Sequence, residues 1–235
     1  MKYLSKIGLP SRLSAVSMVA PLMLMNSVHG FEFNVGGIEG SFDSQLSMGS
    51  SWRVESQDDA LLVRSNGTEN LSNSDDGNRN YNSGDAFSQL FKGVHDLEFR
   101  YQNYGGFVRG KYWYDSALEN NSVEHGHTPT ATKGSATGTD LSFENNSKLD
   151  DSNFNELSKA SGAALLDAFI YGEFDVLNMP LDLRLGRQVV SWGESTFLRG
   201  GINMVNPVDV NAFVRHGAEI KEGLLPVNMA FANIG

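Results

Sequence analysis

Leu181-Asp182-Leu183-Arg184-Leu185-Gly186-Arg187-Gln188-Val189-Val190-Ser191-Trp192 is the stretch of sequence that decides the fold. Leucine alternates with Asp182 and Arg184 at its start, and a period of two residues predicts a β-strand with one apolar and one polar face. The stretch is longer than the usual soluble strand of about five or six residues. It matches a tilted strand that crosses a bilayer, which needs about 9–11 residues.

The same alternation recurs elsewhere along the chain. It predicts strands at residues 39–55, 94–103, 107–115, 164–176 and 181–192, and a sixth strand that begins within 224–233. The strands at 94–103 and 107–115 are separated by a short Gly-containing turn, so they are expected to form a β-hairpin.

The connections between these strands alternate in length. Residues 56–91, 116–161 and 193–222 form long segments, the first two rich in Asn, Ser and Gly, whereas the other connections are short turns. Outer-membrane barrels have short periplasmic turns and long outer loops. The sequence therefore predicts an all-β fold, an antiparallel up-and-down transmembrane β-barrel segment of about five or six strands. Since the smallest bacterial barrels have about eight strands, the chain is expected to be the N-terminal portion of a longer protein.

This topology predicts which residues lie on which side of the membrane. The segments near Asp76, Thr132 and His216 are expected outside, and Gly105 and Asn178 on the periplasmic side. Aromatic residues near strand ends are expected to form the interfacial girdles of a barrel; they are Trp52, Tyr101, Tyr104, Tyr112, Trp113, Tyr114 and Trp192.

The N-terminus has the pattern of a secretory signal peptide over residues 1–30. Lys2, Lys6 and Arg12 precede an apolar stretch at 13–25, and cleavage is expected before Phe31. An uncleaved anchor helix is the alternative. Residues 31–235 are then the barrel domain, and the outer membrane of a Gram-negative cell is the expected location.

Charge and composition exclude several classes of protein. The formal net charge is −10, which argues against nucleic acid as a partner because phosphate binding needs clustered Lys and Arg. The chain has no cysteine, so it has no disulfide framework and no thiolate chemistry. Only the N-terminus carries a long apolar run, which argues against a helical membrane protein.

No residue pattern establishes catalysis. Ser195 and His216 could serve a barrel-borne hydrolase, but spacing fixes no acid or base beside them. His125 and His127 are more typical of a solvated loop than of a metal site. The expectation is therefore a protein that is not an enzyme, with no catalytic residue, cofactor or bound metal.

The segment after Trp192 is the candidate constriction. Asn206 as N-cap and Pro207 at the first helical position predict a short amphipathic helix from Pro207 to His216, ended by Gly217. Folding inward, this loop would narrow a pore; lying on the outer rim, it would form a lid or partner surface. The candidate pore-lining or constriction residues are Arg184, Arg187, Arg199, Asp209, Arg215 and Glu219.

The face of the strand on which Arg187 lies depends on whether the alternation continues unbroken past Gly186. Continuing the alternation from Leu185 turns Arg187 toward lipid, where a charge at the bilayer midplane costs about 2–4 kcal/mol. A bulge at Gly186 would instead turn Arg187 into the lumen. The second interpretation is preferred, although it leaves Gln188 in an awkward position.

A family resemblance extends these inferences. The stretches 185–197, 200–203, 205–213 and 221–226, with Val108-Arg109-Gly110-Lys111-Tyr112-Trp113-Tyr114-Asp115, resemble the proteobacterial family called domain of unknown function 1302. The resemblance implies an outer-membrane β-barrel whose partners are outer-membrane lipid, lipopolysaccharide and lipid-type efflux machinery. The piece Gly186-Arg187-Gln188 is also similar to alginate-export-type porins.

The function expected from these observations is a channel or transport component for small or lipidic solutes. The alternative is an exported β-rich adhesin or binding module, whose long polar loops would bind its partner.

Overall fold

The structure is a computed structural model, and it describes residues 24–57, 76–129, 141–190 and 205–235. Arg199, Trp192, Thr132 and Ser195, which carry predictions from the sequence, lie outside these residues, as does most of the predicted signal peptide.

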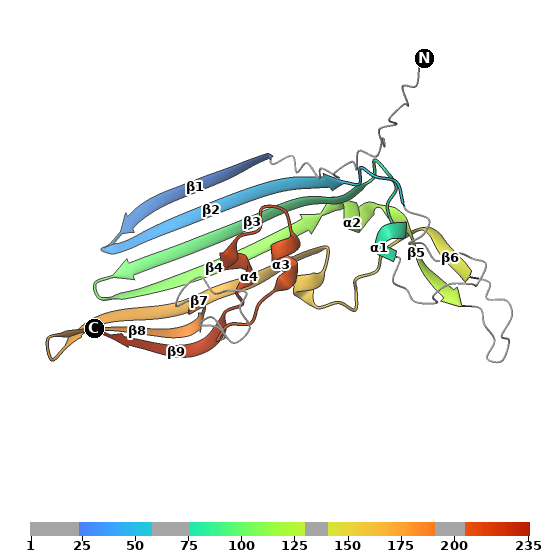
Figure 1. Cartoon of the computed structure of the whole chain (residues 1–235). Helices are drawn as coiled ribbons and strands as arrows, with labels where there is room; N and C mark the ends of the chain where they lie inside the picture. The colour runs from blue at the N-terminus through green and yellow to red at the C-terminus, as the bar shows by residue number, and fades with distance from the viewer. Residues whose placement is uncertain (1–23, 58–75, 130–140, 191–204) are drawn as a thin grey trace, which may run out of the picture.

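One antiparallel sheet of seven long strands dominates the fold (Figure 1). Its strands are β1 (Leu24–Val35), β2 (Ile38–Trp52), β3 (Ala86–Tyr101), β4 (Tyr104–Asp115), β7 (Ser161–Val176), β8 (Met179–Gln188) and β9 (Val227–Ile234). Their order in the sheet is their order in the chain, so the predicted up-and-down antiparallel topology is confirmed. Among the described residues, β1 and β9 each pair on one side only, and the sheet is open.

The predicted alternation of long and short connections is also confirmed. Two-residue turns join β1 to β2, β3 to β4 and β7 to β8, and all three lie at the same end of the sheet (Figure 1), hereafter the short-turn end. Gly36-Gly37 and Leu177-Asn178 both have positive φ at their two positions. Such turns match the right-handed twist of the strands that they connect.

The long connections contain more regular structure than the sequence predicted. β5 (Ser122–Pro129) and β6 (Leu141–Lys148) form a separate hairpin within the predicted polar segment 116–161. β3 begins at Ala86, although residues 56–91 were predicted to be a loop, and β1 adds an unpredicted strand that overlaps the predicted signal peptide. These strands were missed because polar residues and glycines break their alternation.

The helices are all short. They are α1 (Asp76–Arg79), α2 (Ser116–Asn120), α3 (Val210–Val214) and α4 (Ile220–Gly223), with a 3₁₀ turn, η2, at Glu156–Ser158. None of the helices in the described residues has the length and apolarity needed to cross a membrane.

The strand register sorts the side chains onto two faces. One face, hereafter the apolar face, carries large exposed hydrophobic residues such as Phe31, Met48, Ile170 and Leu185, of which the last two are 59% and 60% exposed. The other, hereafter the polar face, carries Asp, Glu, Lys and Arg from the alternate positions. The predicted amphipathic strands are thus present, with the two faces kept in register from strand to strand.

Glycine and aromatic residues pack against each other across neighbouring strands. A Cβ added to Gly93 of β3 would lie 2.5 Å from the Tyr112 ring of β4, and the Phe99 ring lies over Gly106 in the same way. An aromatic ring that covers a glycine on the next strand helps to fix the register of the two strands.

Four of the seven aromatic residues predicted to form girdles are exposed near the ends of the apolar face. Tyr101 and Tyr104 are exposed on the apolar face at the short-turn end, and Trp52 and Tyr114 are exposed near its other end. Trp113 departs from the prediction, because its odd position in β4 turns it to the polar face, where it is buried.

Candidate functional site

Residues 205–226, hereafter the polar-face loop, pack on the polar face of the sheet (Figure 1). Glu222 of α4 accepts a hydrogen bond from Lys92 of β3, and the two side chains are only 5% and 4% exposed. Lys111 of β4 donates to the Glu222 carbonyl over 3.2 Å and lies 3.7 Å from the Asp209 carboxylate. Two buried lysines of the sheet therefore hold two acids of the loop.

Asn206 closes the base of this loop. Its side-chain oxygen accepts from the Val190 amide over 3.0 Å, and its Nδ2 donates to the carbonyls of Gln188 and Leu225 over 3.2 and 3.0 Å. The backbone of Leu225 also donates to Pro207 over 2.8 Å. Asn206 thus ties the two ends of the loop together, and it is not the N-cap that the sequence predicted.

The predicted helix is shorter than expected. Asp209 is the N-cap of α3, accepting from the Asn211 amide over 3.1 Å, and the helix ends at Val214. Residues 207–209 are not helical because they bond to residues 223–225 in an extended ladder. An apolar helix face at Val210, Phe213 and Val214, which the spacing of these residues predicts, is not formed as expected. Val210 and Val214 are 67% and 76% exposed, whereas Ala212 is buried.

His216 and Arg215 make further contacts between the loop and the sheet. The His216 ring hydrogen-bonds to Ser51 of β2 and, over 3.4 Å, to Ser88 of β3, which itself donates to Asp115. The Arg215 guanidinium lies 4.4 Å from the centre of the Trp113 ring. It also donates to the carbonyls of Leu157 and Lys159 over 2.8 and 3.1 Å.

Glu219 contacts β2 at the edge of the loop. Its carboxylate accepts a hydrogen bond from Gln45 and lies 3.1 Å from Lys221. Burial raises the pKa of Glu219, but the Gln45 hydrogen bond and the Lys221 ammonium outweigh it and hold the pKa below its ordinary value. Glu219 is therefore ionised at neutral pH and holds its two partners.

Arg187 does not turn to the polar face. Its strand pairs with β7 in unbroken register, with Arg187 opposite Ala168 and Leu185 opposite Ile170, so there is no register shift at Gly186. Gln188 takes the inward position and is almost completely buried. The preferred interpretation, a bulge that turns Arg187 inward, is therefore wrong. Arg187 is exposed, and it lies near the end of its strand.

The other predicted site residues have different surroundings. Arg184 lies on the polar face and lines a groove, whereas Asp209 and Arg215 are held against the sheet by Lys111 and Trp113. Sequence reasoning missed Lys92, Gln188 and Glu222. Lys92 shares the even-numbered face of β3 with Asp96, Glu98 and Arg100, but Val94 interrupts the polar alternation between them.

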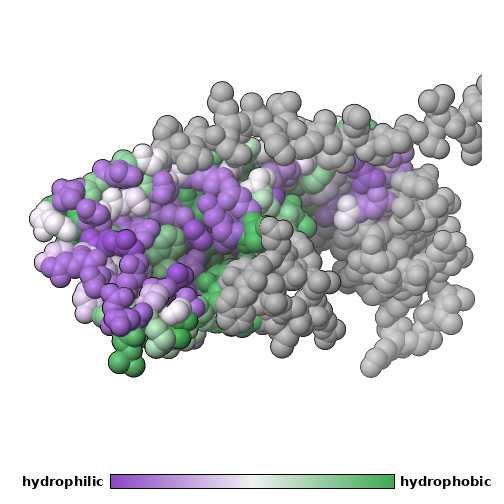
Figure 2. Space-filling view, turned by 60° about the vertical axis from the view of Figure 1, so that its left-hand side comes forward, coloured by the Kyte–Doolittle hydropathy of each residue, from purple (hydrophilic) through white to green (hydrophobic). Residues whose placement is uncertain are grey.

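The groove has a volume of about 580 Å³ and runs along β3, β4, β7 and β8 beside α4. Charged residues of both signs line it, together with aromatic rings. Arg109 donates to both carboxylate oxygens of Asp96 over 2.7 Å and lies 3.5 Å from Asp167. Figure 2, which turns the short-turn end toward the viewer, shows hydrophilic residues gathered over this part of the molecule.

The fold and this site define an antiparallel β-sheet protein whose charged face is partly covered by its own loop. The family described as protein of unknown function (DUF1302) matches residues 11–235, and the chain belongs to that family. The family resemblance predicted from the sequence is thereby confirmed. No curated protein and no solved structure matches the chain.

Proposed function

We propose that this chain forms part of the wall of an outer-membrane β-barrel that passes small or lipidic solutes, narrowed by the polar-face loop. The observation that carries the proposal is the separation of the two faces of the sheet. Large hydrophobic side chains are exposed along one face, and ion pairs and a charged groove occupy the other. A sheet of this kind suits lipid on one side and a water-filled passage on the other.

The strand lengths support the same proposal. β2, β3 and β7 have 15, 16 and 16 residues, which exceeds the roughly 9–11 residues that a tilted strand needs to cross a bilayer. Exposed apolar patches on soluble monomers are rarely this extensive. The apolar face is therefore assigned to membrane lipid, with lipopolysaccharide as the neighbour on the outer side.

The polar-face loop supports a constriction rather than a rim lid. Its contacts reach Gln45, Lys92 and Lys111, which lie within β2, β3 and β4 and not at their ends. A loop on the outer rim would contact only strand ends. The loop would therefore occupy the passage itself and leave the groove beside α4 as the open part.

Sidedness is the first expected outcome. The chain has no cysteine, so single-cysteine variants can be labelled specifically. Asn153→Cys, between β6 and β7, and Asn178→Cys, in a short turn, are matched exposed positions at opposite ends of the sheet. We expect an impermeant maleimide to label position 153 on intact cells and position 178 only after the cells are broken.

Conductance tests the passage itself. The complete native protein, reconstituted in a planar bilayer, is expected to show discrete channel conductance. Labelling of position 178 from outside would overturn the topology, and a native protein recovered only in the soluble fraction would favour the adhesin. A correctly folded protein without conductance would overturn the channel.

A further inference from the structure

Three aromatic rings form a row along the floor of the groove. The rings of Phe107 and Phe169 have centroids 5.5 Å apart, and those of Phe169 and Tyr171 are 6.3 Å apart. All three residues line the groove, whose volume of about 580 Å³ falls within the range of small-molecule sites. A flat apolar body can therefore pack against this row of rings.

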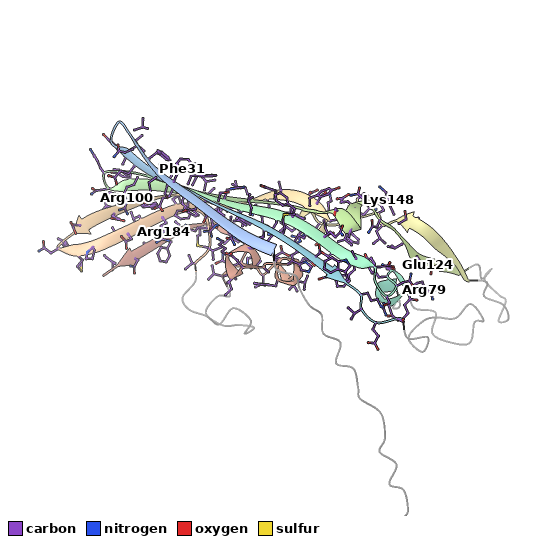
Figure 3. All side chains as sticks on the ribbon, turned by 90° about the horizontal axis from the view of Figure 1, so that it is seen from above. Phe31, Arg79, Arg100, Glu124, Lys148 and Arg184 are labelled. Carbon is purple, nitrogen blue, oxygen red and sulfur yellow. The ribbon has the colours of Figure 1, made fainter. Side chains whose placement is uncertain are left out.

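An arginine lies over each ring of the row. Arg109 is 5.1 Å from the centre of Phe107, Arg184 is 5.7 Å from Phe169, and Arg100 is 5.8 Å from Tyr171. Arg109 is neutralised by Asp96, and Arg100 by Glu173 over 2.7 Å. Figure 3 shows Arg100 and Arg184 toward the same end of the sheet, far from Glu124 and Lys148 of the hairpin.

Arg184 differs from the other two arginines. Its guanidinium lies between the rings of Phe169 and Phe231, 5.9 Å from the latter, and its side chain is exposed. Within the described part of the chain, no carboxylate lies at ion-pair distance from it. The two rings orient the Arg184 guanidinium. Since a guanidinium has five N–H donors in a planar fork, the Arg184 group can donate two hydrogen bonds to the two oxygens of one carboxylate.

The acids around the groove limit the charge of the ligand. Glu98, Glu173 and Asp182 also line it, and they repel a multiply charged anion more strongly than a singly charged one. A phosphate ester with two negative charges is therefore disfavoured. A single carboxylate can pair with Arg184 at a smaller electrostatic cost.

We infer that this groove binds a small aromatic monocarboxylate, with the carboxylate on Arg184 and the aromatic ring packed against the parts of Phe169 and Phe107 that the arginines leave uncovered. The inference deepens the proposed function and rests on it, because it names the class of solute that the passage recognises. The binding site itself needs only the folded sheet and the polar-face loop.

Calorimetric titration with 4-phenylbutanoate tests the inference on the complete native protein in a mild detergent. We expect saturable binding, and binding of the neutral 4-phenylbutanamide that is weaker by about tenfold or more, since it lacks the charge-assisted pair. Arg184→Gln should weaken the affinity for the acid by a similar factor and leave the affinity for the amide unchanged. Arg187→Gln, the matched change three residues along the chain on the apolar face, should leave both affinities within about twofold.

Phe169→Leu provides a second variant that keeps the charge and removes the ring. It should weaken binding of the acid and of the amide by the same factor, about threefold or more, because both ligands pack against the Phe169 ring. Equal affinity for acid and amide, an Arg184→Gln variant that binds the acid as well as the native protein, or no binding at all would overturn the inference.

The titration tests the binding site and the conductance measurement tests the channel, so each proposal can be overturned without the other. A protein that conducts ions but does not bind 4-phenylbutanoate overturns this inference and leaves the channel standing. A protein that binds it with the expected dependence on Arg184, but shows no conductance, supports the site and overturns the proposed function.

Discussion

Replacing Glu222 with leucine is expected to release the polar-face loop from the sheet. Glu222 is the buried partner of Lys92, and removing one member of a buried pair costs about 3–5 kcal/mol because the other charge stays desolvated. The cost disappears when the loop lifts away and water reaches Lys92. Because each 1.4 kcal/mol is about tenfold in an equilibrium constant, the open state should rise by about a hundredfold or more.

Limited proteolysis measures this release. Arg215 and Lys221 are trypsin sites within the loop, so the rate of cleavage there reports how often the loop is open. Glu219→Leu is the matched control, because Glu219 pairs with Lys221 in a site whose two side chains are about one third exposed, 35% and 32%. An exposed pair is worth about 0–1 kcal/mol, so the rate at which trypsin cleaves the loop of the Glu219→Leu variant should differ from the native rate by no more than about fivefold.

A double variant separates charge from packing. Lys92→Leu combined with Glu222→Leu removes both buried charges and should restore most of the native resistance to trypsin, since apolar replacement of a buried pair is often neutral or stabilising. Native-like cleavage of the Glu222→Leu single variant would show that the pair does not hold the loop. A double variant cleaved as fast as the single variant would assign the effect to lost packing.

The sheet could be predicted from the sequence because each amphipathic strand is recognisable from the alternation of apolar and polar residues within it. Alternation at 94–103, 107–115, 164–176 and 181–192 identified β3, β4, β7 and β8, and the parity of the connections gave the up-and-down order. Both signals are local, and neither depends on which strands meet in space. This is why topology was predictable while the ends of β3 and the β5–β6 hairpin were not.

The candidate site was less predictable because it is built by contacts between distant segments. Lys92 and Glu222 are 130 residues apart, and Gln45 and Glu219 are 174 apart. Nothing in the spacing of either residue indicates its partner. Asn206 shows the same limit, since its sequence context suits a helix cap, whereas its three hydrogen bonds to Val190, Gln188 and Leu225 close the loop instead.

Gly186 was recognised as unusual, but for the wrong reason. A glycine within a strand suggests a bulge, and a bulge would have turned Arg187 inward. The strand keeps its register, and Gly186 has a φ of +136°. Since this angle changes no alternation, Arg187 stays on the apolar face and Gln188 is buried.

Gly186→Ala is therefore expected to disrupt the pairing of β7 and β8. An added Cβ would lie 2.5 Å from the Ala168 carbonyl oxygen and 2.8 Å from the Phe169 Cα, so the backbone of β7 must move. The backbone conformation alone costs a side chain about 1–3 kcal/mol, and the clash adds to it.

Gly110→Ala is the matched control in β4, because its added Cβ would meet only the Ala164 carbonyl oxygen at 3.9 Å. The folded fraction of the complete native protein, measured by heat-modifiable migration on detergent gels and by urea unfolding, should fall sharply for Gly186→Ala and remain native-like for Gly110→Ala. Equal stability of the two variants would mean that position 186 tolerates a side chain and that its φ does not constrain the sheet.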